Sequence, residues 1–457
     1  MNPPAILHKL ASMQRYFEGG NTRSLEFRKR QLIRLKESLY KFENEIYEAL
    51  YSDLKKNKEE CWVTEIGFTI AEINYCLKNL SRWMKRQPVS TNLLNLPGSS
   101  YILHEPLGLV LIIGPWNYPL QLVLTPLVGA IAAGNCAVVK PSEFAPATAS
   151  ILQKIISETF EPDYVYLVQG DGASVVPEMM NIFRFDHVFY TGSTEVGKII
   201  YEMAAKKLVP VTLELGGKSP CIVESDADIK VAARRIAMTK FSNAGQMCVA
   251  PDYVLVHESI KEKFITELTK WIEKFYLADN YHYGKIIHKK SFDRIVKHIQ
   301  NSKVIFGGKW NAKDISIEPT LIEETGAPFE VMNEEIFGPL LPIISWKKDE
   351  EVFDVIRQNK NPLALYVFTE DNSKAHKWTS QIPFGGGCIN NASWHLTNHH
   401  LPFGGRGNSG FGAYHGKFSF ETFSHKKAIM RTPTWFDPAL KYPPFKGKLS
   451  MFKKLIR

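Results

Sequence analysis

Strand-like and helix-like segments alternate along most of this 457-residue chain at the spacing of βαβ units. The clearest strand is Leu107–Ile113, a continuous apolar run that Gly114 and Pro115 stop, as expected of a strand buried on both faces. Further strands are predicted at 136–140, 165–168 and 187–190, with helices at about 119–133, 146–160 and 195–207. This alternation predicts an α/β fold built on a parallel, doubly wound sheet.

The alternation restarts near residue 210, which predicts a second α/β domain. We expect a Rossmann-like dinucleotide-binding domain from residues 1–85 and 105–209, and a second domain from residues 210–410. Residues 99–104 and 417–430 alternate enough to be strands of a separate small sheet. They predict an oligomerisation arm at 86–104 and 411–434, followed by a C-terminal tail at 435–457.

The composition excludes several classes of protein. The net charge of +9 comes from short basic runs such as 28–30 and 55–56, which we interpret as solvated faces. No zinc-finger spacing or RNA-binding aromatic box is present, so we expect no nucleic-acid partner, and the charge instead favours an anionic small molecule such as a dinucleotide. Six scattered cysteines, no signal-peptide pattern and no apolar run of about 20 residues predict a soluble cytoplasmic protein without integral membrane association.

Cys248 is the candidate nucleophile. It ends the stretch Phe241–Cys248, whose Asn243, Gly245 and Gln246 are poor core residues and describe a polar loop after a helix. A cysteine attacks carbonyl carbons well because a small fraction is already thiolate near neutral pH. A buried structural thiol is the alternative for a lone cysteine.

Three other segments supply what such a thiolate needs. Asn117 follows a buried strand and lies between two prolines, which fix the backbone so that its amide can donate to a developing alkoxide. Glu214, between two leucines, is placed in a partly apolar setting that suits a general base. Glu335, followed by Ile336 and Phe337, offers a second carboxylate and an aromatic wall.

The segment Tyr190–Gly197 joins a strand to a helix, where backbone N–H groups at Gly192 and Ser193 can meet a phosphate. Its glycines lie five residues apart, so it is not the GxGxxG fingerprint. Lys140 and Glu143 follow the second strand, where an adenosine ribose would bind. Lysine can pair with a phosphate and glutamate can accept from ribose hydroxyls, so the cofactor is NAD or NADP.

Histidines occur at positions 395, 399 and 400, and Pro402 after them favours a loop over a helix. No carboxylate or cysteine nearby completes a set of metal ligands. We therefore predict no metal site and place this loop at the mouth of the active site. Tyr118, Met247 and Trp394 predict an apolar substrate pocket.

At these residues the sequence resembles the aldehyde dehydrogenase family, with at least six motifs in the family's order along nearly the whole chain. Tyr118 in the proline–tryptophan–asparagine motif and the run Ala250–Tyr253 after the cysteine resemble the class 3 branch. That branch oxidises medium- and long-chain aliphatic or aromatic aldehydes and is typically dimeric. The resemblance implies a small-molecule aldehyde as substrate and a homodimer.

The resemblance also implies residue roles. Cys248 is the nucleophile, Asn117 and the Cys248 backbone N–H hold the oxyanion, and Glu214 is the general base. Among the cofactor contacts, Glu335 holds the nicotinamide ribose and Phe337 lies beside the nicotinamide; the others are Lys140, Glu143, Gly192 and Ser193. The predicted reaction is NAD(P)-dependent oxidation of an aldehyde to the acid through a hemithioacetal and a thioester. The alternatives are a CoA-acylating aldehyde dehydrogenase and a non-catalytic cofactor-binding protein.

Overall fold

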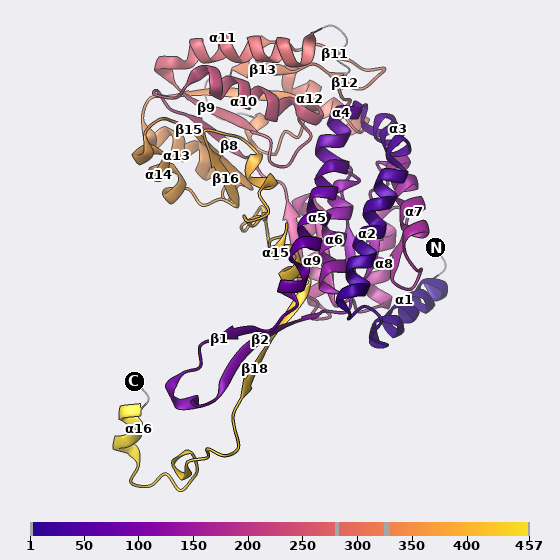
Figure 1. Cartoon of the computed structure of the whole chain (residues 1–457). Helices are drawn as coiled ribbons and strands as arrows, with labels where there is room; N and C mark the ends of the chain where they lie inside the picture. Colours follow the sequence, from indigo (N-terminus) through magenta and orange to yellow (C-terminus); the bar gives the residue numbers. More distant parts are fainter. Residues whose placement is uncertain (1–2, 279–282, 324–329, 456–457) are drawn as a thin grey trace.

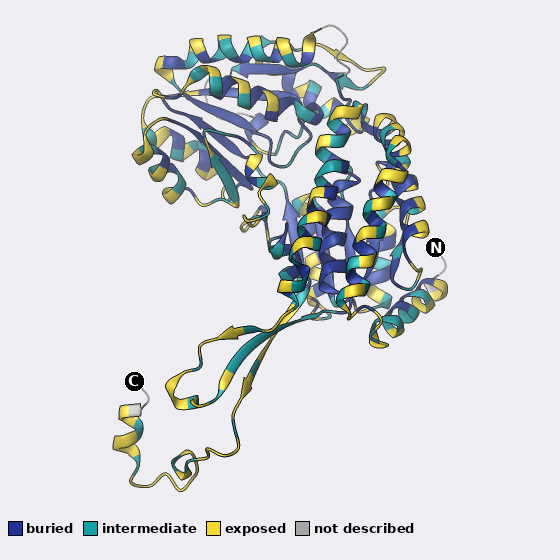
Figure 2. Cartoon of the chain, viewed as in Figure 1, coloured by how far each residue is buried: buried dark blue, intermediate teal, exposed yellow. Residues whose placement is uncertain are grey.

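The computed structural model describes residues 3–278, 283–323 and 330–455 (Figure 1). It consists of two α/β domains and a thin arm that extends away from both. Most strands of both sheets are buried, apart from edge strands such as β10 (Lys303–Phe306) and β16 (Gly386–Ile389), while the covering helices expose their outer faces (Figure 2). No helix in these described ranges is both long enough and apolar enough to cross a bilayer.

The first domain is built on a six-stranded sheet. Its strands run in the order β17-β7-β6-β3-β4-β5, and only β17 is antiparallel to its neighbour. Their bounds are β3 Leu109–Ile113, β4 Cys136–Lys140, β5 Val165–Leu167, β6 His187–Gly192, β7 Val211–Leu215 and β17 Gly410–Phe411. The predicted parallel, doubly wound sheet is thus confirmed. Every residue of β3 is buried, as its continuous apolar run predicted.

Helices before and between these strands cover the sheet. Those before β3 are α1 Pro3–Glu18, α2 Leu25–Lys41, α3 Glu43–Leu54, α4 Lys58–Cys61 and α5 Gly67–Trp83, with a π-helical turn at Trp62–Ile66. Those after it are α6 Gln121–Ala133, α7 Pro146–Thr159, α8 Gly172–Ile182 and α9 Thr194–Ala205. All residues of α6 are buried, because the helix packs between the sheet and the N-terminal helices.

The second domain holds a seven-stranded sheet in the order β10-β13-β14-β9-β8-β15-β16, parallel apart from β10. The strands are β8 Pro220–Val223, β9 Tyr253–His257, β10 Lys303–Phe306, β13 Thr320–Glu323, β14 Leu340–Trp346, β15 Ala364–Phe368 and β16 Gly386–Ile389. The helices are α10 Ile229–Phe241, α11 Lys261–Ile272, α12 Lys289–Gln300, α13 Asp349–Gln358 and α14 Asn372–Gln381. A two-stranded hairpin, β11 Trp310–Asn311 and β12 Ser316–Ile317, is separate from this sheet.

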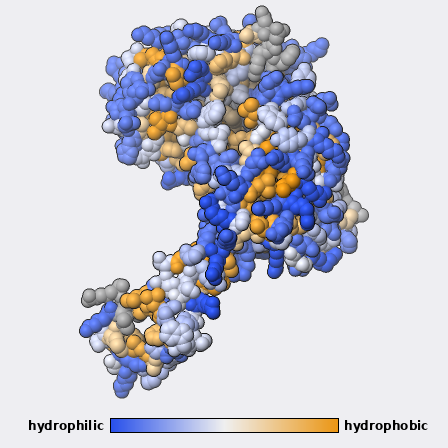
Figure 3. Space-filling model, in the orientation of Figure 1, coloured by the Kyte–Doolittle hydropathy of each residue, from blue (hydrophilic) through white to orange (hydrophobic). Residues whose placement is uncertain are grey.

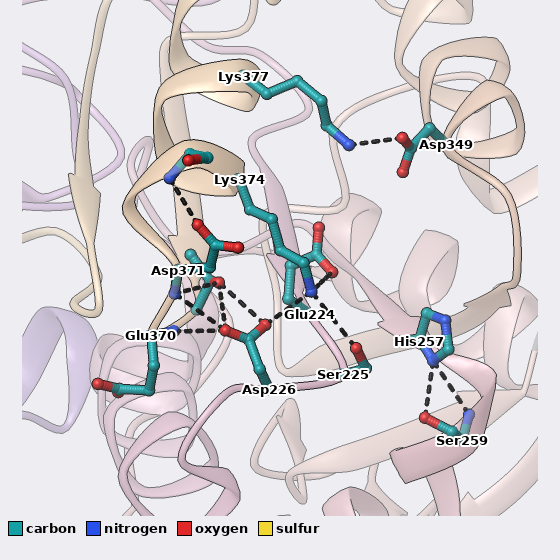
Figure 4. A network of polar contacts seen from close by, with 12 residues as sticks. Glu224, Ser225, Asp226, His257, Ser259, Asp349, Glu370, Asp371, Lys374 and Lys377 are labelled. Atoms are coloured by element: carbon teal, nitrogen blue, oxygen red, sulfur yellow. Dashed lines mark hydrogen bonds and ion pairs between the residues drawn. The ribbon is translucent and has the colours of Figure 1, made fainter.

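A polar network fixes α14 to the carboxyl end of β8 (Figure 4). The buried Glu224 accepts from Trp378 Nε1 at 2.7 Å and pairs with Lys374 at 3.1 Å. Lys374 also contacts Asp226, whose carboxylate accepts the backbone N–H groups of residues 370 and 371. The carboxyl edge of this sheet is therefore closed by structural contacts.

The arm is a three-stranded antiparallel sheet of β1 Gln87–Val89, β2 Ser99–Pro106 and β18 Ser424–Arg431. The prediction of one strand over 417–430 is wrong at its start, because Lys417–Thr422 forms helix α15. Phe420 and Phe423 are spaced three apart and buried, which suits a helical turn against α6. The tail ends in a short helix, α16 Leu449–Leu455, and its last two residues lie outside the described ranges.

Two further expectations need correction. The first sheet contains β7, so it continues past the domain boundary expected at residue 209, and β17 returns to it near residue 410. The basic runs are not uniformly solvated, because Arg28 and Lys56 are buried. Arg28 donates to the carbonyl of Ala132 at 3.1 Å and stabilises the end of α6.

Candidate active site

The predicted site residues gather where the two domains face each other. Asn117 follows β3, and Gly192 ends β6, so both lie at the carboxyl edge of the first sheet beside the point where its strand order reverses. The second domain contributes residues that precede its strands, such as Lys218 before β8 and Asp252 before β9. The carboxyl edge of one sheet thus faces the amino edge of the other.

Two cavities meet at Cys248. The larger, of about 810 Å³, is lined by seven of the predicted residues: Asn117, Gly192, Ser193, Glu214, Cys248, Glu335 and Phe337. The smaller, of about 250 Å³, is lined by the three predicted pocket residues Tyr118, Met247 and Trp394, and again by Cys248. The larger volume is that of a whole ligand site, and the smaller is that of part of one. The thiol therefore separates a large cleft from a smaller, mainly apolar pocket.

A strained loop presents Cys248. After α10 the chain makes a single 3-10 turn at Ser242–Gly245, in which three successive residues have positive φ: Asn243 at 51°, Ala244 at 52° and Gly245 at 72°. A Cβ at position 245 would overlap the carbonyl of Gly338, so only glycine fits there. Left-handed non-glycine residues are costly and persist where the surroundings over-determine them.

Gln246 provides that support. Its side-chain nitrogen donates to the carbonyls of Asn243 at 3.1 Å and Lys285 at 3.0 Å, and its oxygen accepts from Ile287 N at 3.0 Å. The buried amide thus joins the loop to the segment before α12. The sequence marked Gln246 as a loop residue and missed this structural role.

The Asn117 amide is oriented toward the same loop. Its Nδ2 donates to the carbonyl of Gln246 at 3.1 Å, which leaves the second amide hydrogen available to a ligand oxygen. The backbone carbonyl of Asn117 accepts from Lys56 Nζ at 3.1 Å and from Asn243 Nδ2 at 2.8 Å. Asn117 is therefore held at both its backbone and its side chain.

Lys56 and Glu65 form a buried ion pair beneath Asn117 that sequence reasoning missed. Their side chains are fully buried and 2.7 Å apart. The second carboxylate oxygen of Glu65 accepts the backbone N–H groups of Leu120 and Gln121, each at 3.0 Å. The pair therefore fixes the loop on both sides of Asn117. No sequence motif links two residues that lie nine apart on different elements, so the pair could not be predicted.

Glu214 is a buried carboxylic acid on β7. Among the described residues, neither of its side-chain oxygens has a hydrogen-bond partner. Burial without a partner disfavours the charged form, so the pKa of Glu214 lies well above its usual range. Its oxygens are free to bind a ligand or water in the larger cavity, which Glu214 lines.

Glu335 lines the same cavity from the other domain. Its carboxylate lies against Gly216, where a Cβ would overlap it. Burial and the nearby Asp252 carboxylate raise the pKa of Glu335 to about 8, although the Gly217 backbone N–H opposes the shift. Burial and the carboxylates of Glu335 and Glu214 raise the pKa of the Cys248 thiol to about 12. Burial is thus the largest cause of the raised pKa in all three groups.

A second buried ion pair, also missed from the sequence, positions Glu335. Lys218 pairs with Asp252 and donates to the carbonyls of Val331 at 3.0 Å and Glu334 at 2.9 Å. Asp252 in turn accepts from the Ile336 backbone N–H at 3.1 Å. Lys218 lies four residues after Glu214, but nothing in the sequence distinguished this lysine from a solvated one.

The predicted cofactor residues follow the carboxyl edge of the first sheet. Gly192 and Ser193 line the larger cavity, and the Ser193 side chain caps α9. A Cβ at position 192 would overlap the Tyr190 side chain, so glycine is needed there, and no side chain covers the backbone on the side of the cleft. Lys140 and Glu143 do not line that cavity; they pair with each other at the end of β4, two strands from β6, where Gly172 N donates to Glu143 at 2.9 Å. An extended dinucleotide fits this arrangement, since one edge offers bare backbone, a helix N-terminus and a carboxylate able to accept from hydroxyl groups.

The smaller cavity has the apolar lining that the sequence predicted. Tyr118 is buried, with Lys56 Nζ 3.9 Å from its ring centroid. Trp394 is 53% exposed and begins a single 3-10 turn at Trp394–Thr397. The chain then continues as a loop in which His399 lies 3.1 Å from Glu72 of α5. The histidine segment thus forms a loop that borders this cavity, as expected.

Comparisons with known proteins give one family. Residues 4–429 match the model of the aldehyde dehydrogenase family. The chain is 44% identical, over 99% of both chains, to the 4,4'-diaponeurosporen-aldehyde dehydrogenase of Staphylococcus aureus. It is 42% identical to the dimeric NADP-preferring aldehyde dehydrogenase of Canis lupus familiaris, over 95% of this chain and 96% of the relative. The solved substrate-bound state of Staphylococcus aureus AldH superposes with a TM-score of 0.96 at 44% identity, covering 99% of each chain.

Proposed function

The chain belongs to the aldehyde dehydrogenase family and oxidises aldehydes to carboxylic acids with NAD or NADP, and we propose that Cys248 is the nucleophile of this reaction. The observation that supports this assignment is the position of Cys248 on both cavities, one large enough for the cofactor and the other apolar. None of the other five cysteines lines either cavity.

In the first step the Cys248 thiol loses its proton to water, and its sulfur bonds to the aldehyde carbon as the carbonyl π bond breaks. The carbonyl oxygen becomes an alkoxide, which the Asn117 amide and the Cys248 backbone N–H stabilise by hydrogen bonds. The ion pair of Lys56 and Glu65 keeps Asn117 in place, so the donor needs no rearrangement when charge develops. When bound, the nicotinamide cofactor supplies the two-electron oxidant that converts the hemithioacetal into a thioester.

Glu214 then accepts a proton from water, and the resulting hydroxide attacks the thioester carbon. The carbon–sulfur bond breaks, the acid leaves and the thiol is restored. A raised pKa makes the Glu214 carboxylate a stronger base, and its unpartnered oxygens leave it free to bind that water. We assign Glu335 to the nicotinamide ribose and Phe337 to the nicotinamide face, since both line the cleft beside Cys248.

We assign Lys140, Glu143, Gly192 and Ser193 to the ribose and phosphates of the cofactor, because they lie at the carboxyl ends of β4 and β6, the two strands that flank β3 in one sheet. For the substrate we propose medium- or long-chain aliphatic or aromatic aldehydes. The smaller cavity is lined mainly by apolar side chains, among them Tyr118, Met247 and Trp394, and its charged groups are few.

The test is formation of NADH and NADPH by wild type beside Cys248→Ala, with hexanal, decanal and benzaldehyde. Cys248→Ala should lose roughly 1000-fold or more in kcat yet still bind cofactor. Cys388→Ala is the matched control, because Cys388 is the other half-buried cysteine and lies outside both cavities. Unchanged turnover in Cys248→Ala would refute the nucleophile. A higher kcat/KM for a short polar aldehyde would refute the substrate class, and a requirement for CoA would favour the acylating alternative.

We also propose a homodimer in the cytoplasm. The arm and tail carry large apolar side chains that the chain itself leaves exposed, such as Leu93, Trp435 and Leu449, which supports a second subunit as their partner (Figure 3). All six cysteines are free, which supports a reducing compartment.

A further inference from the structure

His288 connects the two domains across the cofactor cleft. It belongs to the second domain, immediately before α12, and its ring lines the larger cavity. The ring centroid lies 6.2 Å from that of Trp116 and 5.1 Å from that of Phe144, the latter edge to face at 69°. Trp116 and Phe144 both belong to the first domain. We call these three rings the aromatic bridge.

The same histidine also caps α12. Its Nδ1 accepts from the backbone N–H of Ser291 at 3.1 Å. Serine, aspartate or asparagine would provide this acceptor at least as well, because these are the side chains that helix N-termini favour. Capping alone does not account for a histidine here. What the histidine adds is a flat ring long enough to contact the opposite domain.

The aromatic bridge spans the expected path of the cofactor. Trp116 adjoins Asn117 and contacts the Phe337 ring at 5.3 Å, which is the nicotinamide end of the cleft. Phe144 adjoins Glu143, which is the adenosine end. An extended dinucleotide that reaches from Glu143 to Phe337 therefore has to pass His288. Phe144 is 50% exposed and does not itself line the larger cavity, so it meets His288 at the margin of the cleft.

We propose that His288 is a cofactor-retaining residue, whose ring closes the cleft against Trp116 and Phe144 and slows the departure of the dinucleotide. The proposal rests on the proposed function, since it takes Glu143 and Phe337 as the two ends of the cofactor site. The bridge must open by parting the rings of opposite domains each time the cofactor enters or leaves. Each aromatic contact adds to the barrier for that opening.

The test separates the ring from the cap. His288→Asn keeps a capping acceptor and removes the ring, whereas His288→Phe keeps a ring and removes the acceptor. In stopped-flow displacement of bound NADH or NADPH by excess oxidised cofactor, His288→Asn should dissociate roughly threefold to tenfold faster than wild type, as expected for one or two lost aromatic contacts. His288→Phe should dissociate at close to the wild-type rate but unfold at a lower temperature, because α12 loses its cap.

Phe144→Leu supplies an independent check from the opposite domain. It should also speed dissociation, and combining it with His288→Asn should add little, because both changes open the same bridge. Equal dissociation rates in wild type and His288→Asn would overturn the proposal. So would a rate in His288→Phe as fast as in His288→Asn, since the cap would then be what matters. A wild-type protein that binds neither NADH nor NADPH would instead refute the cofactor assignment itself.

Discussion

At the scale of single residues, three acidic groups share one cleft, and the two carboxyl groups make the thiol harder to ionise. The Cys248 thiol lies beside the carboxyl groups of Glu214 and Glu335, and all three pKa values are raised. The nicotinamide ring of the oxidised cofactor is positively charged, so its binding in the cleft would favour the thiolate form of Cys248. Binding of the oxidised cofactor should therefore lower the pKa of the Cys248 thiol.

The two glutamates are distinguished by the step they serve. Glu214→Gln should slow thioester hydrolysis roughly 100-fold, because general-base catalysis is lost while the thiol can still attack. The expected result is a burst of NADH, close to one per active site, followed by slow turnover in a rapid-mixing experiment. Glu335→Gln, the control, should raise the KM for cofactor and show no burst. Turnover without a burst in Glu214→Gln would place the base elsewhere.

Glu335 also links stability to pH. Its pKa rises from 4.5 in an unperturbed glutamate to about 8, so the folded protein keeps a proton that the unfolded chain releases. Stability is therefore lost as pH rises through this window. Cofactor-free Glu335→Gln should match wild type near pH 5 and exceed it above pH 8, by roughly 2 kcal/mol after allowing for solvent in the cleft. Thermal unfolding at both pH values measures this. Glu334→Gln, at an exposed neighbour, should show no such gain.

The chemistry-bearing residues could be predicted individually because each needs a particular side chain beside a particular kind of backbone. Cys248, Asn117 and Glu335 all line the cleft as expected. What the sequence could not reveal is which lysines are buried. Lys56 and Lys218 resemble solvated lysines in sequence, and only folding brings them to Glu65 and Asp252. Burial of a charge depends on distant partners, and no local pattern encodes it.

At the scale of elements, two buried ion pairs hold the loops that carry Asn117 and Glu335. Removing one partner of such a pair leaves an uncompensated charge, which typically costs about 3–5 kcal/mol. Loops that bear catalytic groups need this support, because a small displacement of the donor weakens its hydrogen bond to the alkoxide.

Lys56→Met should therefore lower both stability and turnover. Glu65 would keep its two backbone donors but lose its cation, so we expect a loss of about 3 kcal/mol in the free energy of unfolding. Because Asn117 loses a contact to its carbonyl, kcat should fall while the KM for cofactor changes little. Lys58→Met, at an exposed position two residues away, should change stability by less than about 0.5 kcal/mol. Denaturant unfolding together with steady-state kinetics checks both. Wild-type kcat in Lys56→Met would show that Asn117 is held well enough without the pair.

The parallel strands were predictable because burial on both faces leaves a continuous apolar run, as in β3. The strand predicted over 417–430 was wrong at its start because Phe418, Phe420 and Phe423 fit either an alternating or a helical period over so short a segment. Gly416, with a φ of 57°, separates α15 from the chain before it, and contacts with α6 decide in favour of the helix.

At the scale of the whole molecule, the arm is too thin to bury its own apolar residues. It has three strands, of which β1 and β18 are both edge strands, and the tail beyond β18 is mainly irregular. Of the tail's side chains, Trp435 is 77% exposed and Phe445 is 52% exposed. An exposed edge and exposed aromatic residues on one extension favour association with another chain.

Replacing those two anchors should weaken the proposed dimer. Wild type should have a mass of twice 52.0 kDa by light scattering after gel filtration, whereas the double variant Trp435→Ser, Phe445→Ser should shift toward the monomer at low micromolar concentration. Both residues lie outside the two cavities, so the cofactor affinity of the variant should persist. The matched control is Leu7→Ser with Tyr40→Ser, which removes two exposed apolar side chains from α1 and α2 and should leave the mass unchanged. A wild-type monomer would refute the dimer. A double variant that stays fully dimeric would instead place the interface away from the tail, on surfaces that the arm alone supplies.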